Sequence, residues 1–474
     1  MNRPNILFIL TDDQGVWAAG CYGNKEIRTP GIDRVASTGI RFDNFFVETP
    51  VCSPSRATFL TGRIASQHGI HDWIREGNIG SDAACYLEGE LAYTDVLAQA
   101  GWICGISGKW HLGHSQQEQH GFEHWYVHQQ GGGEYNNAPM IRNGELIEEP
   151  GYVTDAITAD ALSFIDRHGN GEQPFYLGVH YTAPHSPWTG HPQAIVDSYE
   201  ECLFESCPQE AIHEWAVDQP LTQNCLGNRE MLKGYFASVT AMDMGVVKLL
   251  NKLEALGIRE STLVVFTSDN GFSCGHHGFW GKGNGTSPLN MYENSIKVPF
   301  LVSQPGIVNA GSAVDGLVCS YDFMPTLLEF VGCEVPSTRN LPGLSFAHML
   351  NAGASETSSS KERDLVVTET AQVGFGEYGK TRMVRTPDWK YIHRFQEGPH
   401  ELYHLSEDPG EHSNLSGDVA YQRRSNEFQG ILQDWYARYA TDCRRDGRFC
   451  AVTGKGQLRP VDGTSEANEI FSQI

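Results

Sequence analysis

Two short pairs of oxygen-bearing residues end apolar stretches that lie far apart in the chain. They are Asp12-Asp13 and Asp269-Asn270. One such pair alone indicates a turn, because these residue types are common in turns. Two pairs at the ends of neighbouring strands instead predict an oxygen-only site for Ca²⁺ or Mg²⁺, since hard cations prefer carboxylate and amide oxygens.

Cys52 opens a pattern that predicts a short helix. The run is CSPSR at 52–56. Pro54 suits the first turn of a helix, Ser53 its cap and Gly62 its end. Residue 52 is therefore expected at a helix N-terminus, where unpaired N–H groups and the helix dipole favour negative charge. From these residues alone, a small buried apolar cysteine and a reactive thiolate both stay open.

These candidate residues need a scaffold that brings distant stretches together. Three runs rich in β-branched and aromatic residues are predicted as central parallel strands, namely Asn5–Leu10, Phe175–Tyr181 and Thr262–Phe266. The clearest helix is predicted from Asn228 to Leu256, with Gly257 as its stop. Strands that alternate with helices predict an α/β fold: a doubly wound, mostly parallel sheet flanked by helices. Ligands of such folds bind at the carboxyl ends of the strands.

The chain is longer than one compact core usually allows, so a second, smaller domain is expected. The polar stretch from Gly353 to Lys361 has the composition of a linker. We predict a catalytic domain over residues 1–355 and a C-terminal α+β domain over residues 363–474. The smaller domain is expected to hold a short antiparallel sheet and a helix, at Leu365–Thr368, Thr381–Arg385, Lys390–Arg394 and Asn426–Tyr439.

The composition excludes several classes of function. With 34 lysines and arginines against 58 aspartates and glutamates, the formal charge is −24, so neither a nucleic acid nor an anionic membrane is an expected partner. No apolar run approaches a membrane span. The 12 cysteines show no zinc-finger spacing, and whether any form disulfides stays open. The chain enters its first strand too early for a signal peptide, so we expect a cytoplasmic protein, or a periplasmic or secreted one if a signal peptide was removed.

The run CSPSRATFLTGR resembles the signature of the cysteine-type sulfatases of the alkaline phosphatase superfamily. In that family, Cys-x-Pro-x-Arg directs oxidation of the cysteine to formylglycine by a separate maturation enzyme. The resemblance continues through NILFILTDDQG, GKWHLG, APHSPW, TSDNG, HGFWGKG and ELYHLSEDPGEHSNL. It implies the same two-domain α/β fold, with the smaller domain closing over the active site, and the activity of a sulfuric ester hydrolase.

The resemblance also implies roles for individual residues. A metal ion, Ca²⁺ more often than Mg²⁺ in this family, would be held by Asp12, Asp13, Asp269, Asn270 and residue 52. Residue 52, as a formylglycine hydrate, would be the nucleophile, and Arg56 would brace that hydrate. Contacts to the sulfate or the formylglycine fall to Lys109, His111, His185 and Lys282. His185 is the predicted general acid, with Lys282 as its competitor, and His111 is the predicted base.

A further group of aromatic, histidine and charged residues has no role in the resemblance. Aromatic faces and arginine or histidine donors suit carbohydrates, so we predict that some of these residues bind a sugar; ordinary loop packing is as good an explanation for each. They are His71, Asp72, Trp73, Arg75, Trp188, His191, Tyr378, His393 and Arg394. The predicted substrate is a sulfated carbohydrate, either a small molecule or a short oligosaccharide, because the acidic chain would repel long polyanions.

Two other functions fit the same motifs. A phosphonate monoester or phosphodiester hydrolase of the same superfamily can also use formylglycine, and its substrate shares a singly charged tetrahedral centre. A non-catalytic sulfoglycan-binding protein is the alternative of another class, and it predicts an unmodified Cys52 and binding without turnover. The two lysines and His185 favour a sulfatase over the first alternative, and the intact signature, the four metal-type residues and both histidines favour it over the second. The oligomeric state is left open.

Overall fold

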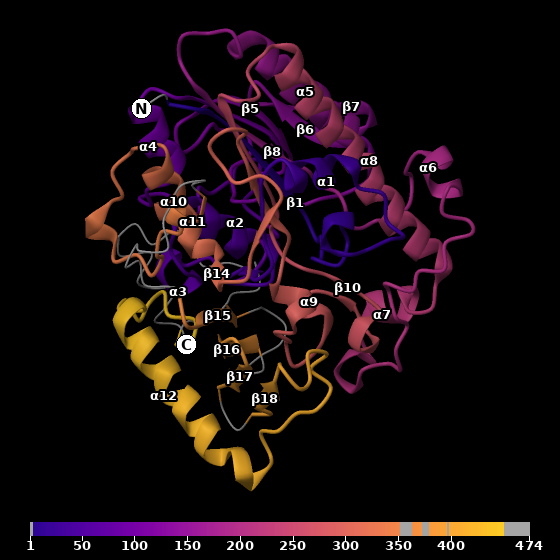
Figure 1. Cartoon of the computed structure of the whole chain (residues 1–474), viewed down its shortest axis with the longest axis vertical. Helices are drawn as coiled ribbons and strands as arrows, with labels where there is room; N and C mark the ends of the chain where they lie inside the picture. Colours follow the sequence, from indigo (N-terminus) through magenta and orange to yellow (C-terminus); the bar gives the residue numbers. More distant parts are fainter. Residues whose placement is uncertain (1–2, 351–362, 372–378, 396–397, 450–474) are drawn as a thin grey trace.

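The computed structural model describes residues 3–350, 363–371, 379–395 and 398–449. A ten-stranded mixed sheet with helices on both faces forms the larger part, and a four-stranded antiparallel sheet beside α12 forms the smaller part (Figure 1). The predicted fold class is confirmed. The predicted linker, residues 353–361, lies outside the described residues, and the division into domains 1–355 and 363–474 stays a prediction.

Five parallel strands form the middle of the large sheet, in the order β9-β1-β8-β4-β5. Their bounds are β1 Asn5–Thr11, β4 Ile103–Gly108, β5 Phe122–His128, β8 Phe175–His180 and β9 Thr262–Ser268. Antiparallel pairing of β12 with β9 and of β6 with β5 extends the sheet on both sides. The outer strands are β2 Ile40–Phe42, β6 Asn136–Arg142, β7 Glu145–Tyr152, β12 Phe300–Ser303 and β13 Ser312–Val314. The three predicted central strands are the adjacent strands β8, β1 and β9.

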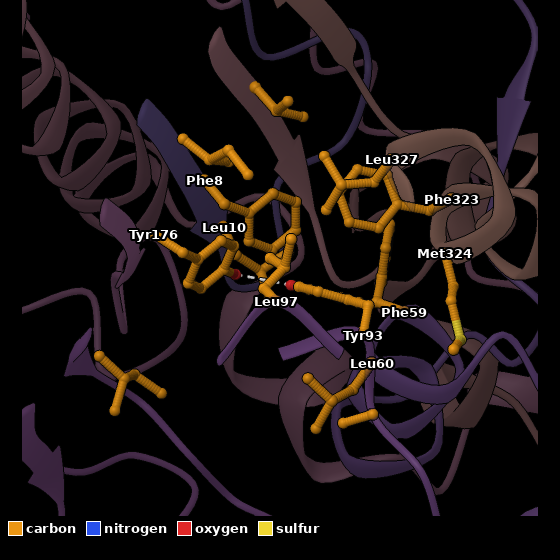
Figure 2. Close-up of a cluster of buried hydrophobic side chains, with 14 of the residues drawn as sticks. Phe8, Leu10, Phe59, Leu60, Tyr93, Leu97, Tyr176, Phe323, Met324 and Leu327 are labelled. Atoms are coloured by element: carbon orange, nitrogen blue, oxygen red, sulfur yellow. Dashed lines mark hydrogen bonds between the residues drawn. The ribbon is translucent and has the colours of Figure 1, made fainter. Parts of the chain in front are cut away.

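Side chains of β1 alternate between two hydrophobic cores, because successive residues of a strand point to opposite faces. Leu7 and Ile9 pack in the core under α1, α5 and α8, whereas Phe8 and Leu10 belong to the core on the other face, beside Phe59 (Figure 2). Helices α2, α4, α10 and α11 cover that second face. The helix bounds are α1 Pro30–Ser37, α2 Cys52–Thr61, α4 Tyr93–Gln99, α5 Val153–His168, α8 Arg229–Ala255, α10 Phe323–Phe330 and α11 Ala347–Leu350.

Helix α2 is the predicted helix of the cysteine motif, but Ser53 does not cap it. The helix begins at Cys52, with Val51 at the cap position and no side-chain cap bond. Ser53 Oγ instead donates to the backbone oxygen of His111 at 2.9 Å and accepts from the backbone N–H of Ile74 at 3.1 Å. Ser53 therefore ties two loops to the first turn of α2. Gly62 ends the helix with a φ of 66°, as predicted.

The smaller sheet shares a hydrophobic core with the larger part, since Phe46 and Ile64 pack with Val367 and Tyr436. Its elements are β15 Val366–Ala371, β16 Lys380–Arg385, β17 Trp389–Arg394, β18 Glu401–His404 and α12 Gln422–Tyr439. Short elements complete the loops: β3 Phe45–Phe46, α3 Ala65–His68, α6 Gln193–Asp197, α7 Pro220–Cys225, β10 Ser273–Cys274, β11 Trp280–Gly281, α9 Glu293–Ile296 and β14 Val318–Cys319. Within the described ranges, no helix combines the length and the apolar character that a membrane span requires.

Candidate active site

The carboxyl ends of β1 and β9 bring the two oxygen-bearing pairs together. The two strands are parallel, and their last residues are register partners, so the chain that follows each strand emerges at the same edge of the sheet. The backbone N–H of Asp13 donates to Asp269 Oδ1 at 3.3 Å, and Asn270 Nδ2 donates to Asp13 Oδ1 at 2.7 Å. These residues and Asp12 are all buried.

Cys52 lies at the same edge, in the first turn of α2. Its thiol donates to Asp12 Oδ1 at 3.3 Å, and Lys282 Nζ donates to its sulfur at 2.9 Å. Burial, together with the charge of Asp12, raises the pKa of the Cys52 thiol to about 12. The unmodified thiol is therefore protonated at neutral pH and is a weak nucleophile.

The oxygens at this edge fit a hard divalent cation. One ligand atom from each of Asp12, Asp13, Cys52 and Asp269 lies within 4.8 Å of the other three, and all four residues are buried. Asn270 adds a buried Oδ1 atom that has no hydrogen-bond partner among the described residues. Carboxylates with an amide oxygen are the donors that Ca²⁺ and Mg²⁺ prefer, and a buried acceptor without a partner is unusual unless a ligand satisfies it.

Three buried cations balance the three buried carboxylates. The ion pairs are Lys109–Asp12, Arg56–Asp269, with 2.8 Å between Nε and Oδ2, and Lys282–Asp13, with 2.5 Å between Nζ and Oδ1. Pairing with an opposite charge offsets the free-energy cost of burying each charged group. The carboxylates therefore hold the three cations next to residue 52.

The pairing also sets the protonation of the charged groups. Burial alone would raise the pKa of Asp12, but the charge of Lys109 and other nearby cations holds it well below its usual range. Burial and the neighbouring Asp12 raise the pKa of Asp269 to about 6. Burial would lower the pKa of Lys282, but Asp13 and the other acidic neighbours raise it well above its usual value. Lys282 therefore remains charged throughout the neutral range.

His111 and His185 each present one ring nitrogen. His111 Nε2 lies 2.9 Å from the backbone oxygen of Ile74 and must carry the proton, while its buried Nδ1 has no partner among the described residues. His185 Nδ1 donates to the backbone oxygen of Ser186 at 2.7 Å, and its Nε2 lies 3.9 Å from Asp13 Oδ2. Burial and the charge of Lys109 hold the pKa of His111 well below its usual value. His111 is therefore neutral and can accept a proton at Nδ1.

A pocket of about 320 Å³ opens over these groups, and two glycines form part of its wall. A Cβ atom on Gly131 would lie 2.3 Å from His111 Cε1, and one on Gly132 would lie 3.2 Å from His185 Nδ1. The backbone can lie this close to the two imidazole rings because glycine has no Cβ atom. The remaining wall residues include Trp73, Ile74, Arg75, Gln130, Leu221, Phe272 and Asn284.

Of the predicted sugar-binding residues, Trp73 and Arg75 line this pocket. Asp72 is buried behind them, with its Oδ2 atom 3.3 Å from Arg75 Nη2. His71 is also buried, and its Nε2 atom lies 2.7 Å from the backbone oxygen of Arg445. Asp72 and His71 thus hold the loop and do not face the pocket.

The other members of the predicted sugar-binding group that the structure describes do not line this pocket. Trp188 and His191 are buried and do not belong to the pocket wall. Arg394 is fully buried in an ion pair within the smaller sheet, and His393 lines a separate cavity beside α12. Tyr378 lies outside the described residues. The buried cations of β17 instead tie the smaller sheet to the larger part, since Arg394 Nη2 donates to the backbone oxygen of Leu289 at 2.6 Å and Lys390 Nζ to that of Met291 at 2.9 Å.

Sequence reasoning missed several wall residues, among them Gly131, Gly132, Leu221, Phe272 and Asn284. Gly131 and Gly132 belong to a run of three glycines, which is a signal of close backbone approach. Leu221, Phe272 and Asn284 carry no comparable local signal, because their place depends on how distant loops meet over the sheet.

Comparison with known families decides the class of this site. Residues 4–333 match the family model described as Sulfatase, and residues 275–437 match the model described as N-sulphoglucosamine sulphohydrolase, C-terminal. The chain belongs to the sulfatase family. It is therefore a sulfuric ester hydrolase, which confirms the predicted family and enzyme class.

Individual sulfatases match this chain over most of its length. The chain is 29% identical to the N-acetylglucosamine-6-O-sulfatase of Bacteroides thetaiotaomicron, over 92% of this chain and 87% of that protein. It is also 29% identical to the ulvan-active sulfatase of Formosa agariphila, over 91% and 80%. A solved structure of a protein in complex with its substrate D-glucosamine-2-N,6-O-disulfate matches with a TM-score of 0.79 and 27% identity, over 93% of this chain and 99% of that chain.

The close approach of Gly131 to the His111 ring can be tested by substitution. Gly131→Ala is expected to lower kcat on p-nitrophenyl sulfate at least about tenfold, because the new methyl group displaces the His111 ring. Gly133→Ala is the matched control, since its Cβ atom would have no neighbour closer than 3.8 Å. Wild-type turnover in Gly131→Ala, at an unchanged thermal unfolding midpoint, would show that this wall does not position His111.

Proposed function

We propose that this sulfatase hydrolyses a sulfate ester on a carbohydrate, with the 6-O-sulfate of a glucosamine as the leading substrate. Two similar proteins support this choice, one named for N-acetylglucosamine 6-O-sulfate and one bound to a glucosamine disulfate. The observation that carries the proposal is the arrangement of the pocket. Cys52, the candidate metal ligand Asp13 and both histidines line the same pocket as Trp73 and Arg75.

We infer that residue 52 acts as formylglycine, produced by a separate maturation enzyme. When present, formylglycine supplies a hydrated aldehyde, one hydroxyl of which attacks sulfur while the other later allows sulfate to leave. Lys282 and Asp12 contact the side-chain atom of residue 52 in the unmodified chain. Arg56 donates from Nη1 to the backbone oxygen of Lys109 at 3.0 Å, and its buried Nη2 has no partner among the described residues. That unsatisfied donor supports a bracing role for Arg56.

The oxygen cluster supports Ca²⁺ as the bound ion. Asp12, Asp13, Asp269 and Asn270 would hold it, with residue 52 as a further ligand. Mg²⁺ keeps several waters in most protein sites, whereas Ca²⁺ accepts a larger set of protein oxygens, which suits this buried cluster better. When bound, the ion supplies positive charge that polarises the sulfate group.

The two histidines would carry the proton transfers. His185, which is 27% exposed and hydrogen-bonded at Nδ1, donates a proton from Nε2 to the oxygen of the departing alcohol as the sulfur–oxygen bond breaks. His111, neutral and unbonded at Nδ1, accepts the proton that the second hydroxyl loses. Lys109 and Lys282 stabilise the negative charge that builds on the sulfate oxygens.

The nucleophile can be tested by mass spectrometry and turnover together. Protein co-expressed with a formylglycine-generating enzyme is expected to show the thiol-to-aldehyde mass change at residue 52 and to hydrolyse N-acetylglucosamine 6-sulfate. Cys52→Ser is expected to lose multiple turnover and to accumulate with a sulfuryl group on the new serine, because that ester has no second hydroxyl to expel the sulfate. Cys85→Ser, at a half-buried cysteine outside the pocket, should behave like wild type. Normal turnover in Cys52→Ser would contradict the assignment.

The ion can be tested without an activity assay. Calorimetric titration of chelator-treated protein with Ca²⁺ is expected to show one binding event and a rise in the thermal unfolding midpoint, because an ion that binds only the folded state stabilises it. Asn270→Ala should weaken Ca²⁺ binding, since it removes the Oδ1 atom that has no protein partner. Asn251→Ala, on the exposed side of α8, is the control. Absence of both Ca²⁺ and Mg²⁺ binding in the wild type would rule out the metal site.

The general acid can be identified from the leaving group. His185→Ala is expected to lower kcat on N-acetylglucosamine 6-sulfate by about 10²- to 10⁴-fold, the usual contribution of a positioned acid or base. The loss on p-nitrophenyl sulfate should be much smaller, because nitrophenolate departs without a proton. His168→Ala, outside the pocket, should change neither rate. An equal loss on both substrates would remove His185 from this role and leave Lys282 as the remaining candidate.

A further inference from the structure

The pocket wall holds an arginine that the proposed mechanism does not use. Arg75 lines the pocket, and its side chain is 27% exposed. Its guanidinium carbon lies 4.5 Å from the centre of the Trp73 ring. Asp72 is the only hydrogen-bond acceptor of the Arg75 guanidinium within the described part of the chain, through one contact of 3.3 Å. A guanidinium carries five N–H donors, so most of those of Arg75 are available to a ligand.

The carboxylate that pairs with Arg75 is hidden from the pocket. Asp72 is fully buried, and its Oδ1 atom accepts from the backbone N–H of Trp73 at 2.8 Å. Asp72 also does not belong to the pocket wall, whereas Trp73 and Arg75 do. An anion that enters the pocket therefore meets the cation of this pair and not its carboxylate. In a chain of net charge −24, such a one-sided arrangement is well suited to an acidic ligand.

The loop that carries Arg75 is held next to the catalytic groups. The backbone of Ile74 donates to Ser53 Oγ at 3.1 Å and accepts from His111 Nε2 at 2.9 Å. The residue before Arg75 is therefore bonded both to the helix of Cys52 and to the candidate base. A guanidinium in this place is preorganised, so little entropy is lost when it binds a ligand.

Residues that follow α12 hold the other end of the loop. His71 Nε2 lies 2.7 Å from the backbone oxygen of Arg445, and the backbone N–H of Gly447 donates to Ser66 Oγ at 2.9 Å. Ser66 is also bonded to Glu369 of β15, with 2.7 Å from its backbone nitrogen to Oε1. The smaller sheet and the segment after α12 thus fix the position from which Arg75 reaches the pocket.

We propose that Arg75, oriented by Trp73 and Asp72, forms a second anion subsite that binds a negatively charged group of the substrate other than the ester being cleaved. The group is a second sulfate or a carboxylate on the same or the adjoining sugar, because both present the oxygen pair that a guanidinium fork binds. This subsite rests on the proposed carbohydrate substrate. It would make the enzyme select multiply anionic sugars over singly sulfated ones.

The test compares 6-sulfated glucosamine substrates that lack or carry a second anion. The probes are N-acetylglucosamine 6-sulfate, D-glucosamine-2-N,6-O-disulfate, and a disaccharide of N-acetylglucosamine 6-sulfate with a uronic acid. For wild type, kcat/KM should be higher on at least one doubly anionic probe than on N-acetylglucosamine 6-sulfate. Arg75→Gln should lower the ratio of these two kcat/KM values at least about tenfold, as expected when a charge-assisted hydrogen bond is lost. Arg75→Lys should restore part of it, because lysine keeps the charge but not the planar fork.

Arg28→Gln is the matched control. Arg28 also lies over an aromatic ring, 4.1 Å from the centre of Tyr199, but it is outside the pocket. In Arg28→Gln, the ratio of kcat/KM on the doubly anionic probes to kcat/KM on N-acetylglucosamine 6-sulfate should equal that of wild type. A fall for the disulfate alone identifies a sulfate as the second anion, and a fall for the uronic acid probe alone identifies a carboxylate. An unchanged ratio in Arg75→Gln, with the thermal unfolding midpoint preserved, would overturn the subsite.

Equilibrium binding separates failure of this inference from failure of the proposed function. The same three probes can be titrated calorimetrically into Cys52→Ala protein, with and without Arg75→Gln. A selective loss of affinity for a doubly anionic probe supports the subsite even if wild type cleaves none of the three, in which case the leading substrate is wrong. Equal loss of affinity for all probes overturns the subsite even if all three are cleaved.

Discussion

Burial of three carboxylates at one edge of the sheet is the constraint on which the rest of this structure depends. A buried ionic group without a partner costs several kcal/mol, and removal of one partner from a buried pair is similarly costly. Ion pairs offset that cost here, since Asp12, Asp269 and Asp13 pair with Lys109, Arg56 and Lys282, respectively. Folding and chemistry therefore draw on the same residues, because the cations that make the carboxylates tolerable are also the ones beside residue 52.

This balance gives a physical reason for the site to bind an anion. Three carboxylates and three cations leave the centre close to neutral when no ion is bound. A divalent cation among the oxygens would add two positive charges in a buried region of low polarity, where charges interact strongly. An entering sulfate ester offsets part of that excess. The metal site and the substrate site would thus strengthen each other through electrostatics alone.

The parts of the fold that were predictable are those whose pattern is local. Strands β1, β8 and β9 are runs buried on both faces, so their composition alone reveals them. Parallel pairing then requires their polar ends to meet, which is why the oxygen cluster could be expected from two short pairs. The outer strands β6 and β7 and the last small strand, β18, have less distinctive sequences, and none of them was predicted.

Side-chain direction was much harder to predict than secondary structure. Ser53 has the residue type of a helix cap, yet its hydroxyl is used by the backbones of His111 and Ile74. Arg394 has a residue type that suits a sugar site, yet it is buried in an ion pair. In both cases tertiary contacts outweigh local preference: Ile74 is 21 residues from Ser53 in sequence, and Arg394 also donates to the backbone oxygen of Leu289, 105 residues away.

The division between sheet-borne and loop-borne residues explains how one chemistry can serve different sugars. The ion pairs Lys109–Asp12, Arg56–Asp269 and Lys282–Asp13 form what we call the charged floor of the site. Strand ends and the N-terminal half of α2 carry these residues, and a change in one of them leaves a buried partner unpaired. The wall is carried by loops, where Trp73, Arg75 and Leu221 keep partial exposure and can change without disturbing that balance. Relatives at 29% identity can therefore share the floor and differ in the wall. Because the segment after α12 holds the loop of Arg75, the proposed subsite would let a change in the smaller part alter substrate choice without touching the candidate catalytic groups.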